Sequence, residues 1–309
     1  MSNLKSPLTS STFRRLLKTN LAEVTEAENN DLPKQGMKFY REIDSDMAQE
    51  EFFDVSGLPD AEPFNGKLSY VGQAPGYYNK IEPKEFTLAT QTQRKFIDDN
   101  QYGVLENQAK AMIRAMGRTK EKYCARPFNN AFSTSWDFQQ SEEGLSLCNS
   151  SHTNKSGTST SSGFDNSGTS ALSKTAVAST WLQMRQFRDT ISERMEMDDS
   201  YAIICPDTLG DTAETIVGTI KGLDTAEHNV NPQYGRYNVE RYMRLDDFST
   251  TNWFMVNRTL MKKYLVWINH TDADYNNTVD FDTYSLKHSL YSRWGNGFLN
   301  WRFISGHVV

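Results

Sequence analysis

The sequence predicts an α+β fold whose first third is extended, and three observations carry this prediction. Residues 51–97 contain eight glycine or proline residues, which is too many for a helix. Residues 98–124 place apolar side chains at helical spacing. The segments 201–205 and 252–257 are apolar runs of strand length, with a helix-like stretch between them. Helices and strands therefore alternate after an extended beginning, without an internal repeat.

Composition and charge favour some classes of protein over others. The chain has 309 residues, of which 37% are hydrophobic, so it can bury a sizeable core. Its formal net charge is −6, and its best basic cluster is Arg114, Arg118, Lys120 and Lys122. Proteins that grip nucleic acid normally neutralise phosphates with a basic patch or stripe. The charge therefore gives no sign of strong nucleic-acid binding, but it fits many soluble enzymes equally well, so by itself it decides little.

The cysteines and the first residues indicate a compartment. Cys124, Cys148 and Cys205 are an odd number at wide spacing and form no CxxC pair, which is typical of a reducing cytoplasm. The first residues lack the apolar core of a signal peptide, and no run of about 18 apolar residues could span a membrane. We expect a soluble protein made in the cytoplasm.

The first hundred residues are expected to bury little of themselves. Residues 1–50 form a polar leader with one amphipathic helix over residues 12–24, and we expect a flexible tail or an arm that becomes ordered on a neighbouring molecule. Residues 51–97 are expected to form a long β-hairpin or loop excursion, with strands at 67–71 and 86–90. A compact domain rarely carries so long an excursion unless something uses it.

The clearest helix is predicted over residues 98–124. Asp98 or Asp99 is its expected N-cap, because a carboxylate oxygen accepts the free N–H groups of the first turn. Pro127 is its expected end. One face of this helix carries Leu105, Ala109, Met112, Ile113 and Met116.

The second half is patterned more strongly. Residues 149–173 form a Ser/Gly-rich surface loop, and Asp207 is expected to cap a helix that follows the strand 201–205. Trp301 is expected to be buried on one face of the last strand. A further helix is expected over 175–195, and further strands over 264–268, 278–290 and 297–304.

The sharpest candidate for chemistry is the pair Cys148 and His152. A thiol nucleophile and its base must face each other beside an oxyanion hole. These two residues lie at the edge of a Ser/Gly-rich loop, where such precision is hard to hold, so we favour a loop anchored by packing and hydrogen bonds over a thiol hydrolase.

Other sites are weaker still. Asp272 and Asp274 resemble a calcium loop but lack its sixth-position glycine and closing glutamate, so we favour a polar hairpin turn over a surface cation site. Gly295-Asn296-Gly297 is a hairpin-turn signal, and no phosphate-binding glycine motif is present. We therefore predict no catalytic, cofactor-binding or metal-ligating residue.

Several stretches in register resemble a known family. They are GLSLCNSSH at 144–152, YAIICPD at 201–207, NWFMV at 252–256, FDTY at 281–284 and RWGNGF at 293–298. From Gly144 onward their order resembles the major head subunits of Mu-like tailed phages, which belong to the wider Hong Kong 97 capsid fold. The upstream part agrees in the order of its features but not in specific letters.

The resemblance implies a subunit that assembles with itself, as hexamers and pentamers, into the icosahedral head of a tailed phage enclosing double-stranded DNA. It implies a scaffold, a portal and decoration proteins as partners, no sequence-specific DNA binding and no membrane. The location would be the virion capsid, assembled in the host cytoplasm. The implied segments are an N-terminal arm (1–50), an extended hairpin or E-loop (51–97), a spine helix and peripheral (P) domain with the Ser/Gly-rich loop (98–174), an axial (A) domain (175–275) and C-terminal strands returning to the P domain (276–309).

Two alternatives stay open at this point. An encapsulin-type cellular compartment would share the fold and load protein cargo in place of nucleic acid. A thiol hydrolase using Cys148 and His152 would belong to another class altogether.

Overall fold

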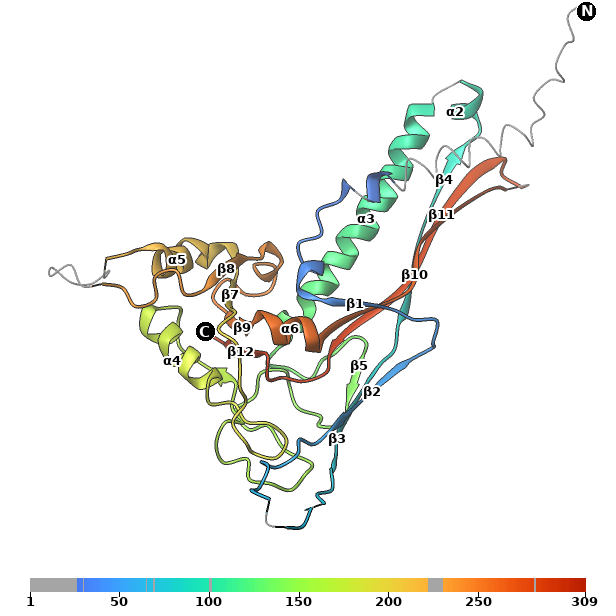
Figure 1. The fold of residues 1–309 in the computed structure, drawn as a ribbon. Coiled ribbons are helices and arrows are strands. Elements are labelled where there is room, and N and C mark those ends of the chain that lie inside the picture. The colour runs from blue at the N-terminus through green and yellow to red at the C-terminus, as the bar shows by residue number, and fades with distance from the viewer. Residues whose placement is uncertain are drawn as a thin grey trace, which may run out of the picture. The chain divides into compact units, whose positions relative to one another are not determined.

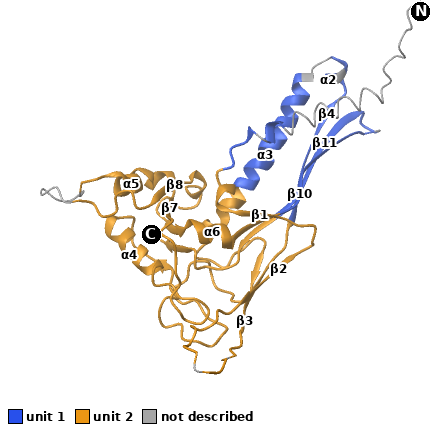
Figure 2. Ribbon diagram, in the orientation of Figure 1, with its two compact units in different colours: residues 1–34, 84–121, 269–294 blue, residues 35–83, 122–268, 295–309 orange. Residues whose placement is uncertain are grey.

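The computed structural model divides the chain into two compact units, shown in Figure 2. Unit 1 comprises residues 1–34, 84–121 and 269–294, and unit 2 comprises 35–83, 122–268 and 295–309. The helix expected over 12–24 lies outside the residues that the structure describes. The described residues are 27–29, 31–64, 66–68, 70–99, 102–221, 230–280 and 282–309.

Unit 1 consists of a long helix on an antiparallel sheet (Figure 1). It holds β4 (Lys84–Gln93), α2 (Lys95–Asp98), and the larger parts of α3 (Tyr102–Asn129), β10 (Leu265–Val279) and β11 (Ser285–Phe298). Strands β11 and β4 pair antiparallel along the whole of β4. The full sheet has the strand order β1-β10-β11-β4, where β1 is Arg41–Asp44. The predicted strand 86–90 is thereby confirmed.

The core of unit 1 is the interface between α3 and this sheet. The apolar helix face predicted from the sequence is buried, and it packs against Tyr275 of β10 and Leu290 of β11. The rings of Phe86 and Trp294 stack at 4.0 Å between centroids. The buried helix residues are Leu105, Ala109, Met112, Ile113 and Met116.

The long helix differs from its prediction at both ends. It begins at Tyr102, so Asp98 and Asp99 do not cap it, and Asp98 is the last residue of α2. It also continues through Pro127 to Asn129. Proline lacks the N–H that would bond the carbonyl four residues earlier. Here that carbonyl, of Tyr123, accepts a hydrogen bond of 2.8 Å from the side chain of Asn296, which explains why the helix tolerates the proline.

Unit 2 contains a five-stranded sheet of order β6-β12-β9-β7-β8. Its central strands β7 and β9 are antiparallel and buried along their full length, which confirms the predictions at 201–205 and 252–257. The strands are β6 (Ser167–Gly168), β7 (Tyr201–Cys205), β8 (Asn238–Arg241), β9 (Trp253–Asn257) and β12 (Ile304–His307). Short helices of the same unit are η1 (Met37–Phe39), α4 (Lys174–Met184), α5 (Asp207–Gly218), η2 (Met243–Leu245) and α6 (Arg258–Tyr264).

A second, three-stranded sheet in unit 2 has the order β2-β3-β5. It consists of β2 (Glu50–Val55), β3 (Pro75–Ile81) and β5 (Gln139–Ser141). The hairpin expected within 51–97 is therefore formed by residues 50–81, because β4 pairs with β11 instead. The predicted strand 67–71 is wrong: the described residues of that segment form no strand.

The end of the chain also differs from its prediction. The expected strand 297–304 is broken: β11 ends at Phe298, a turn follows, and β12 pairs with β9 and β6. Trp301 is buried as predicted, but it lies in the turn, where its ring stacks on that of His152 at 4.1 Å. The last strand therefore lies in the five-stranded sheet of unit 2.

Two helix predictions in unit 2 need correction. The helix expected over 175–195 ends at Met184, after which Phe187 turns inward and is fully buried against Trp301. Asp207 does not cap α5: the N-cap is Pro206, which offers no side-chain bond. The carboxylate of Asp246 takes that role and accepts the N–H of Asp207 at 2.7 Å.

Two predicted turns are strand. Asp272 and Asp274 lie within β10, and Asp272 pairs with Lys120 at 3.0 Å. Gly295-Asn296-Gly297 lies within β11, where the glycines permit close approach. A Cβ on Gly297 would lie 2.8 Å from Ile81, and one on Gly295 would lie 3.2 Å from the backbone of Pro83. The two glycines therefore serve close packing, and the predicted turn at this position is wrong.

Candidate assembly interface

The hairpin β2–β3 carries an unusual number of exposed apolar side chains. We call the segment 56–74 between its strands the hairpin loop. Along the hairpin, eight large apolar side chains are between 40% and 92% exposed, with Tyr70 the most exposed. Exposed apolar side chains that gather in one place mark protein–protein contact sites. They are Phe53, Val55, Leu58, Phe64, Leu68, Tyr70, Val71 and Tyr78.

The neck of this loop is closed by hydrogen bonds, so the loop leaves a fixed point. The N–H of Ser56 donates to the carbonyl of Ala74 at 2.9 Å, and the N–H of Ala74 donates to the Ser56 hydroxyl at 2.8 Å. The N–H of Gly57 donates to the Thr190 hydroxyl at 3.0 Å. The loop is therefore presented from a defined position of unit 2.

The base of the hairpin is anchored more firmly. Strand β3 pairs with β5 over residues 79–81. Asn79 is buried, and its side chain donates to the carbonyl of Leu299 at 2.8 Å. Gln139 donates to the Asn79 side chain at 2.9 Å and accepts the N–H of Phe298 at 2.8 Å. Because buried polar groups are costly to leave unpaired, this network fixes the hairpin on the body of unit 2.

Cys148 and His152 do not face each other as a catalytic pair. The two ring nitrogens of His152 contact Glu143 and Asn166, each at 3.1 Å. The Cys148 thiol lies against Gly306 of β12, since a Cβ there would be 2.7 Å from its sulfur. Burial raises the pKa of this thiol far above its usual range, so the reactive thiolate is suppressed.

The surroundings of His152 also argue for a structural role. Burial alone raises the pKa of the Glu143 carboxyl, but hydrogen bonds from His152 and Thr153 outweigh it and hold that pKa below its usual range. The recess beside Glu143, Trp301 and Arg302 has a volume of about 30 Å³, which is room for a water or two and not for a substrate. The structure thus places His152 in hydrogen bonds and ring stacking, which is what an anchored loop requires.

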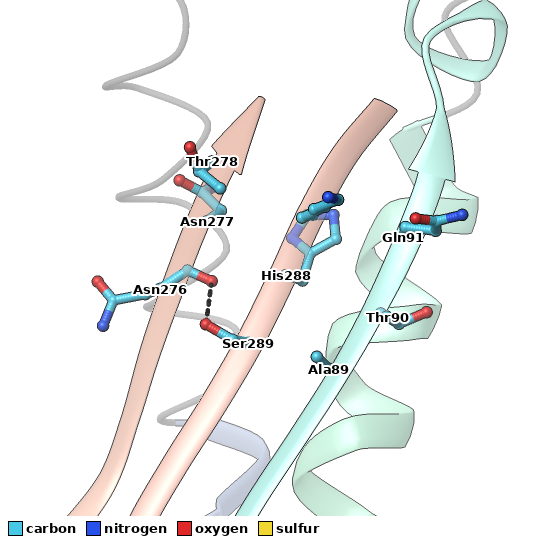
Figure 3. A pocket seen from close by; sticks show the side chains of 9 residues that line it. Ala89, Thr90, Gln91, Asn276, Asn277, Thr278, His288 and Ser289 are labelled. Carbon is cyan, nitrogen blue, oxygen red and sulfur yellow. Dashed lines mark hydrogen bonds between the residues drawn. The ribbon is translucent and has the colours of Figure 1, made fainter. Parts of the chain in front are cut away.

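Unit 1 offers a hollow of about 530 Å³ on its sheet. Figure 3 shows that its lining residues come from three adjacent strands, β10, β11 and β4. Its middle is low because Ala89 and Ser289 are small and lie opposite each other in register. The ammonium of Lys287 at its edge is paired with Asp280 at 2.7 Å. The Nδ1 atom of His288 is hydrogen-bonded to the Tyr275 hydroxyl, and the Ser289 hydroxyl donates to the carbonyl of Asn276, so these two lining residues are not paired with each other.

Searches for other kinds of site gave simple results. Within the described ranges, no three His, Cys, Asp or Glu side chains come together in a way that could hold a metal ion. In those ranges, no helix combines the length and the apolar character needed to cross a lipid bilayer.

The sequence comparison decides the family. The model of a family described as phage capsid protein matches residues 79–304, which is most of the chain. The chain belongs to this family. It is a phage capsid protein, a structural subunit of the phage head, and the encapsulin alternative is disfavoured. No curated protein sequence matches this chain.

Solved structures show the same fold at low sequence identity. The procapsid of bacteriophage JBD30 matches with a TM-score of 0.50 and 12% identity, covering 97% of this chain and 76% of that one. Mycobacterium phage Patience matches with a TM-score of 0.54 and 8% identity, covering 99% and 94%. The capsid of a native GTA particle matches with a TM-score of 0.53 and 9% identity, covering 89% and 90%. The predicted Hong Kong 97-type capsid fold is confirmed.

Sequence reasoning found the hairpin but missed its chemistry. The glycines and prolines of 51–97 predicted the excursion. The sequence analysis did not predict that the aromatic and aliphatic side chains of this segment would be exposed. The available signal was the lack of a regular apolar period between Phe53 and Tyr78. Large apolar residues that fit neither a helix nor a strand pattern cannot be buried by their own segment.

Proposed function

We propose that this capsid protein builds a closed icosahedral shell around double-stranded DNA, and that the hairpin loop provides the main contact with neighbouring copies. The observation that carries the proposal is the set of eight exposed apolar side chains on a hairpin whose base is fixed by buried hydrogen bonds. Covering such side chains removes apolar area from water at about 25 cal/mol per Å². A shell whose many copies are not joined by a separate linking protein needs such a contact between subunits.

The segments would have the following roles. Residues 1–50 are an arm, and residues 50–81, within the expected 51–97, are the E-loop. The helix α3 with the sheet of unit 1 corresponds to a spine helix and P domain, and the five-stranded sheet to an A domain that also receives the chain end through β12. These assignments rest on the order of elements and on the strand pairings.

The remaining partners are proposals of the same kind. Copies would associate as hexamers and pentamers, with a scaffold during assembly in the host cytoplasm, a portal at one vertex and decoration proteins outside. The protein would carry out no catalysis, a proposal supported by the separate partners of Cys148 and His152.

Electron microscopy of the full-length protein, co-expressed with its neighbouring phage genes, tests the shell. We expect closed particles or capsomers, and a strictly monomeric protein under all conditions would overturn the proposal. A variant in which a short Gly-Ser link replaces residues 58–72 tests the hairpin loop. It keeps the neck at Ser56 and Ala74, so we expect a folded subunit that forms few or no shells.

The matched control changes polar residues of the same loop, Asp60→Asn and Glu62→Gln, and should assemble as the unchanged protein does. Normal shells from the shortened variant would show that the loop does not hold copies together.

A further inference from the structure

Unit 2 contains a hollow of about 290 Å³ with an apolar floor and a basic rim, which we call the basic hollow. Its floor consists of buried apolar residues from β7, β9, η1 and α6. Lys38, Arg258 and Lys262 bring three positive charges to the lining, against the single carboxylate of Glu240. Pockets that hold small ligands measure about 300–1,000 Å³, so this hollow suits inserted side chains better than a cofactor.

The positive charges of the lining are compensated unequally. Lys38 pairs with Glu240 at 2.5 Å. The ammonium of Lys262 donates to the carbonyl of Tyr40 at 2.8 Å. Arg258 is exposed, and it takes part in none of the ion pairs between residues that the structure describes. The excess of positive charge is therefore centred on α6.

Two further carboxylates lie near the basic hollow but outside its lining. Asp198 accepts hydrogen bonds from the side chains of Asn257 and Thr259. Burial lowers the pKa of Lys262, and the nearby Glu42 carboxylate counteracts part of this shift. Glu42 therefore offsets some of the charge on Lys262, which leaves Arg258 as the best-placed cation for a partner.

The turn between β1 and β2 has the complementary character. Residues 44–51, which we call the acidic turn, hold four carboxylates and no positive charge. Met47 at its tip is 66% exposed. The Ser45 hydroxyl donates to the Glu50 carboxylate and accepts the N–H of Met47 at 3.1 Å. These bonds hold the turn in shape, so it presents an apolar tip among negative charges.

The carboxylates of the acidic turn also differ in how far they are compensated. Lys80 lies opposite Glu51 in the pairing of β2 with β3, so it offsets the charge at the end of the turn. Asp44 and Asp46 are exposed and lie on the side of the turn that follows β1. These two carboxylates, with Met47, form the part of the turn that matches an apolar hollow with a basic rim.

The acidic turn cannot fill the hollow of its own copy. In Figure 1, β1 runs from the neighbourhood of α6 to the acidic turn, and four residues of a strand span about 13 Å. The hairpin loop of unit 2 also combines carboxylates with apolar side chains. Its two carboxylates are offset by Lys67, however, so the acidic turn is the stronger electrostatic match for the hollow.

We infer that the acidic turn of one copy inserts Met47 into the basic hollow of a second copy, with Asp44 and Asp46 beside Arg258 and Lys262. The inference rests on the proposed function, to which it adds a contact separate from the hairpin loop. Methionine is flexible and fills irregular apolar gaps. Because the contact joins two different surfaces, it repeats from copy to copy and closes into a ring where the rotation allows.

The test exchanges charges across the contact in the full-length protein. Asp46→Arg and Arg258→Glu each place like charges together, so each alone should lower the fraction of protein in shells more than about tenfold. In the double variant every copy carries both changes, which restores attraction at each contact, so shells should return. Sedimentation and electron microscopy measure the shells, and circular dichroism shows that the subunits are folded.

The matched control is Lys263→Glu, which makes the same charge change at an exposed position of α6 outside the lining. It should assemble as the unchanged protein does and should not rescue Asp46→Arg. If Arg258→Glu does not fold, Arg258→Gln and Asp46→Asn replace the charge exchange. Their losses of assembly should then be less than additive in a double-mutant cycle.

Normal shells from either charge-reversed variant would overturn the inference, and so would a folded double variant that does not recover. Loss of shells with Arg258→Glu alone would also overturn it, and would assign the hollow to an acidic segment of another protein. If the unchanged protein forms no shells, the proposed function fails. If it forms shells but the exchange does not rescue them, only the pairing of turn and hollow fails.

Discussion

The hairpin loop and the five-stranded sheet use the same kinds of residue in opposite ways. In β7 and β9, every residue is buried between neighbouring strands and helices. In the hairpin loop, Phe64, Tyr70 and their neighbours face solvent. Burying one large apolar side chain contributes about 2 kcal/mol, so the sheet stabilises the single chain while the loop cannot. The loop can contribute only when a second molecule covers it.

The residues that stabilise the subunit are therefore separate from the residues that we propose join subunits. Substitutions in the sheet and its supporting turns should change the free energy of unfolding of the subunit. Substitutions in the hairpin loop should change shell formation and leave that free energy nearly constant. The variants below test this contrast, in decreasing order of their expected effect on the stability of the subunit.

Trp301→Asp should have the largest effect. Trp301 is buried and packs against His152 and Phe187. The change removes a large ring and buries an unpaired charge, so we expect a loss of more than about 4 kcal/mol and insoluble protein. Expression and centrifugation check this, with Trp301→Phe as the control that stays soluble. Soluble, assembling Trp301→Asp protein would contradict the packing described for the turn.

Acid should destabilise the sheet through His307. Burial lowers the pKa of His307 from 6.5 to about 4, so the folded state binds fewer protons than the unfolded state between these values. Stability should therefore fall as pH falls from about 6.5 to about 4, by at most about 3 kcal/mol, and change no further below that for this group.

The measurement is denaturant unfolding of the unchanged protein and of His307→Gln across this pH range. Carboxylates also respond to acid, so the difference between the two curves isolates His307. Parallel curves would show that His307 does not contribute in this way.

Asn296→Ala should lower the free energy of unfolding by about 1 to 2 kcal/mol. It removes the hydrogen bond to the Tyr123 carbonyl, and Pro127 has no N–H that could replace this bond within the helix. In a Pro127→Ala background, residue 127 regains the backbone N–H that can bond the Tyr123 carbonyl. Asn296→Ala should then lower the free energy of unfolding by less. A double-mutant cycle by thermal or denaturant unfolding checks this, and additive effects would count against the compensation.

Phe64→Ser with Tyr70→Ser should change the stability of the subunit least, by less than about 0.5 kcal/mol. Both side chains are more than 70% exposed, so the folded subunit loses little. Shell yield by electron microscopy should nevertheless drop, while Asp60→Asn with Glu62→Gln leaves it unchanged. A large loss of stability in the Ser variant would mean that the loop packs on its own subunit.

Local patterns predicted the helices and strands whose residues are buried at regular intervals along the chain. The run from Tyr201 to Cys205 is a strand because it is continuously apolar and bounded by Pro206. The apolar face of α3 is buried at the positions its period indicates. These elements follow from the sequence because each residue contributes to the same pattern.

The tertiary structure alone decided the positions where distant segments meet. Gly295-Asn296-Gly297 has the letters of a turn, yet it is strand, because Ile81 and Pro83 pass close to it. Pro127 has the character of a helix end, yet Asn296, far along the chain, supplies the missing partner. Cys148 and His152 are four residues apart, yet Cys148 packs against Gly306 and His152 contacts Glu143. The α+β class and the excursion that becomes the hairpin follow from the sequence by itself, because they depend on local composition and periodicity, whereas the capsid fold was implied by the resemblance of the stretches from Gly144 onward. Which side chains remain exposed for another copy depends on what the folded chain leaves uncovered.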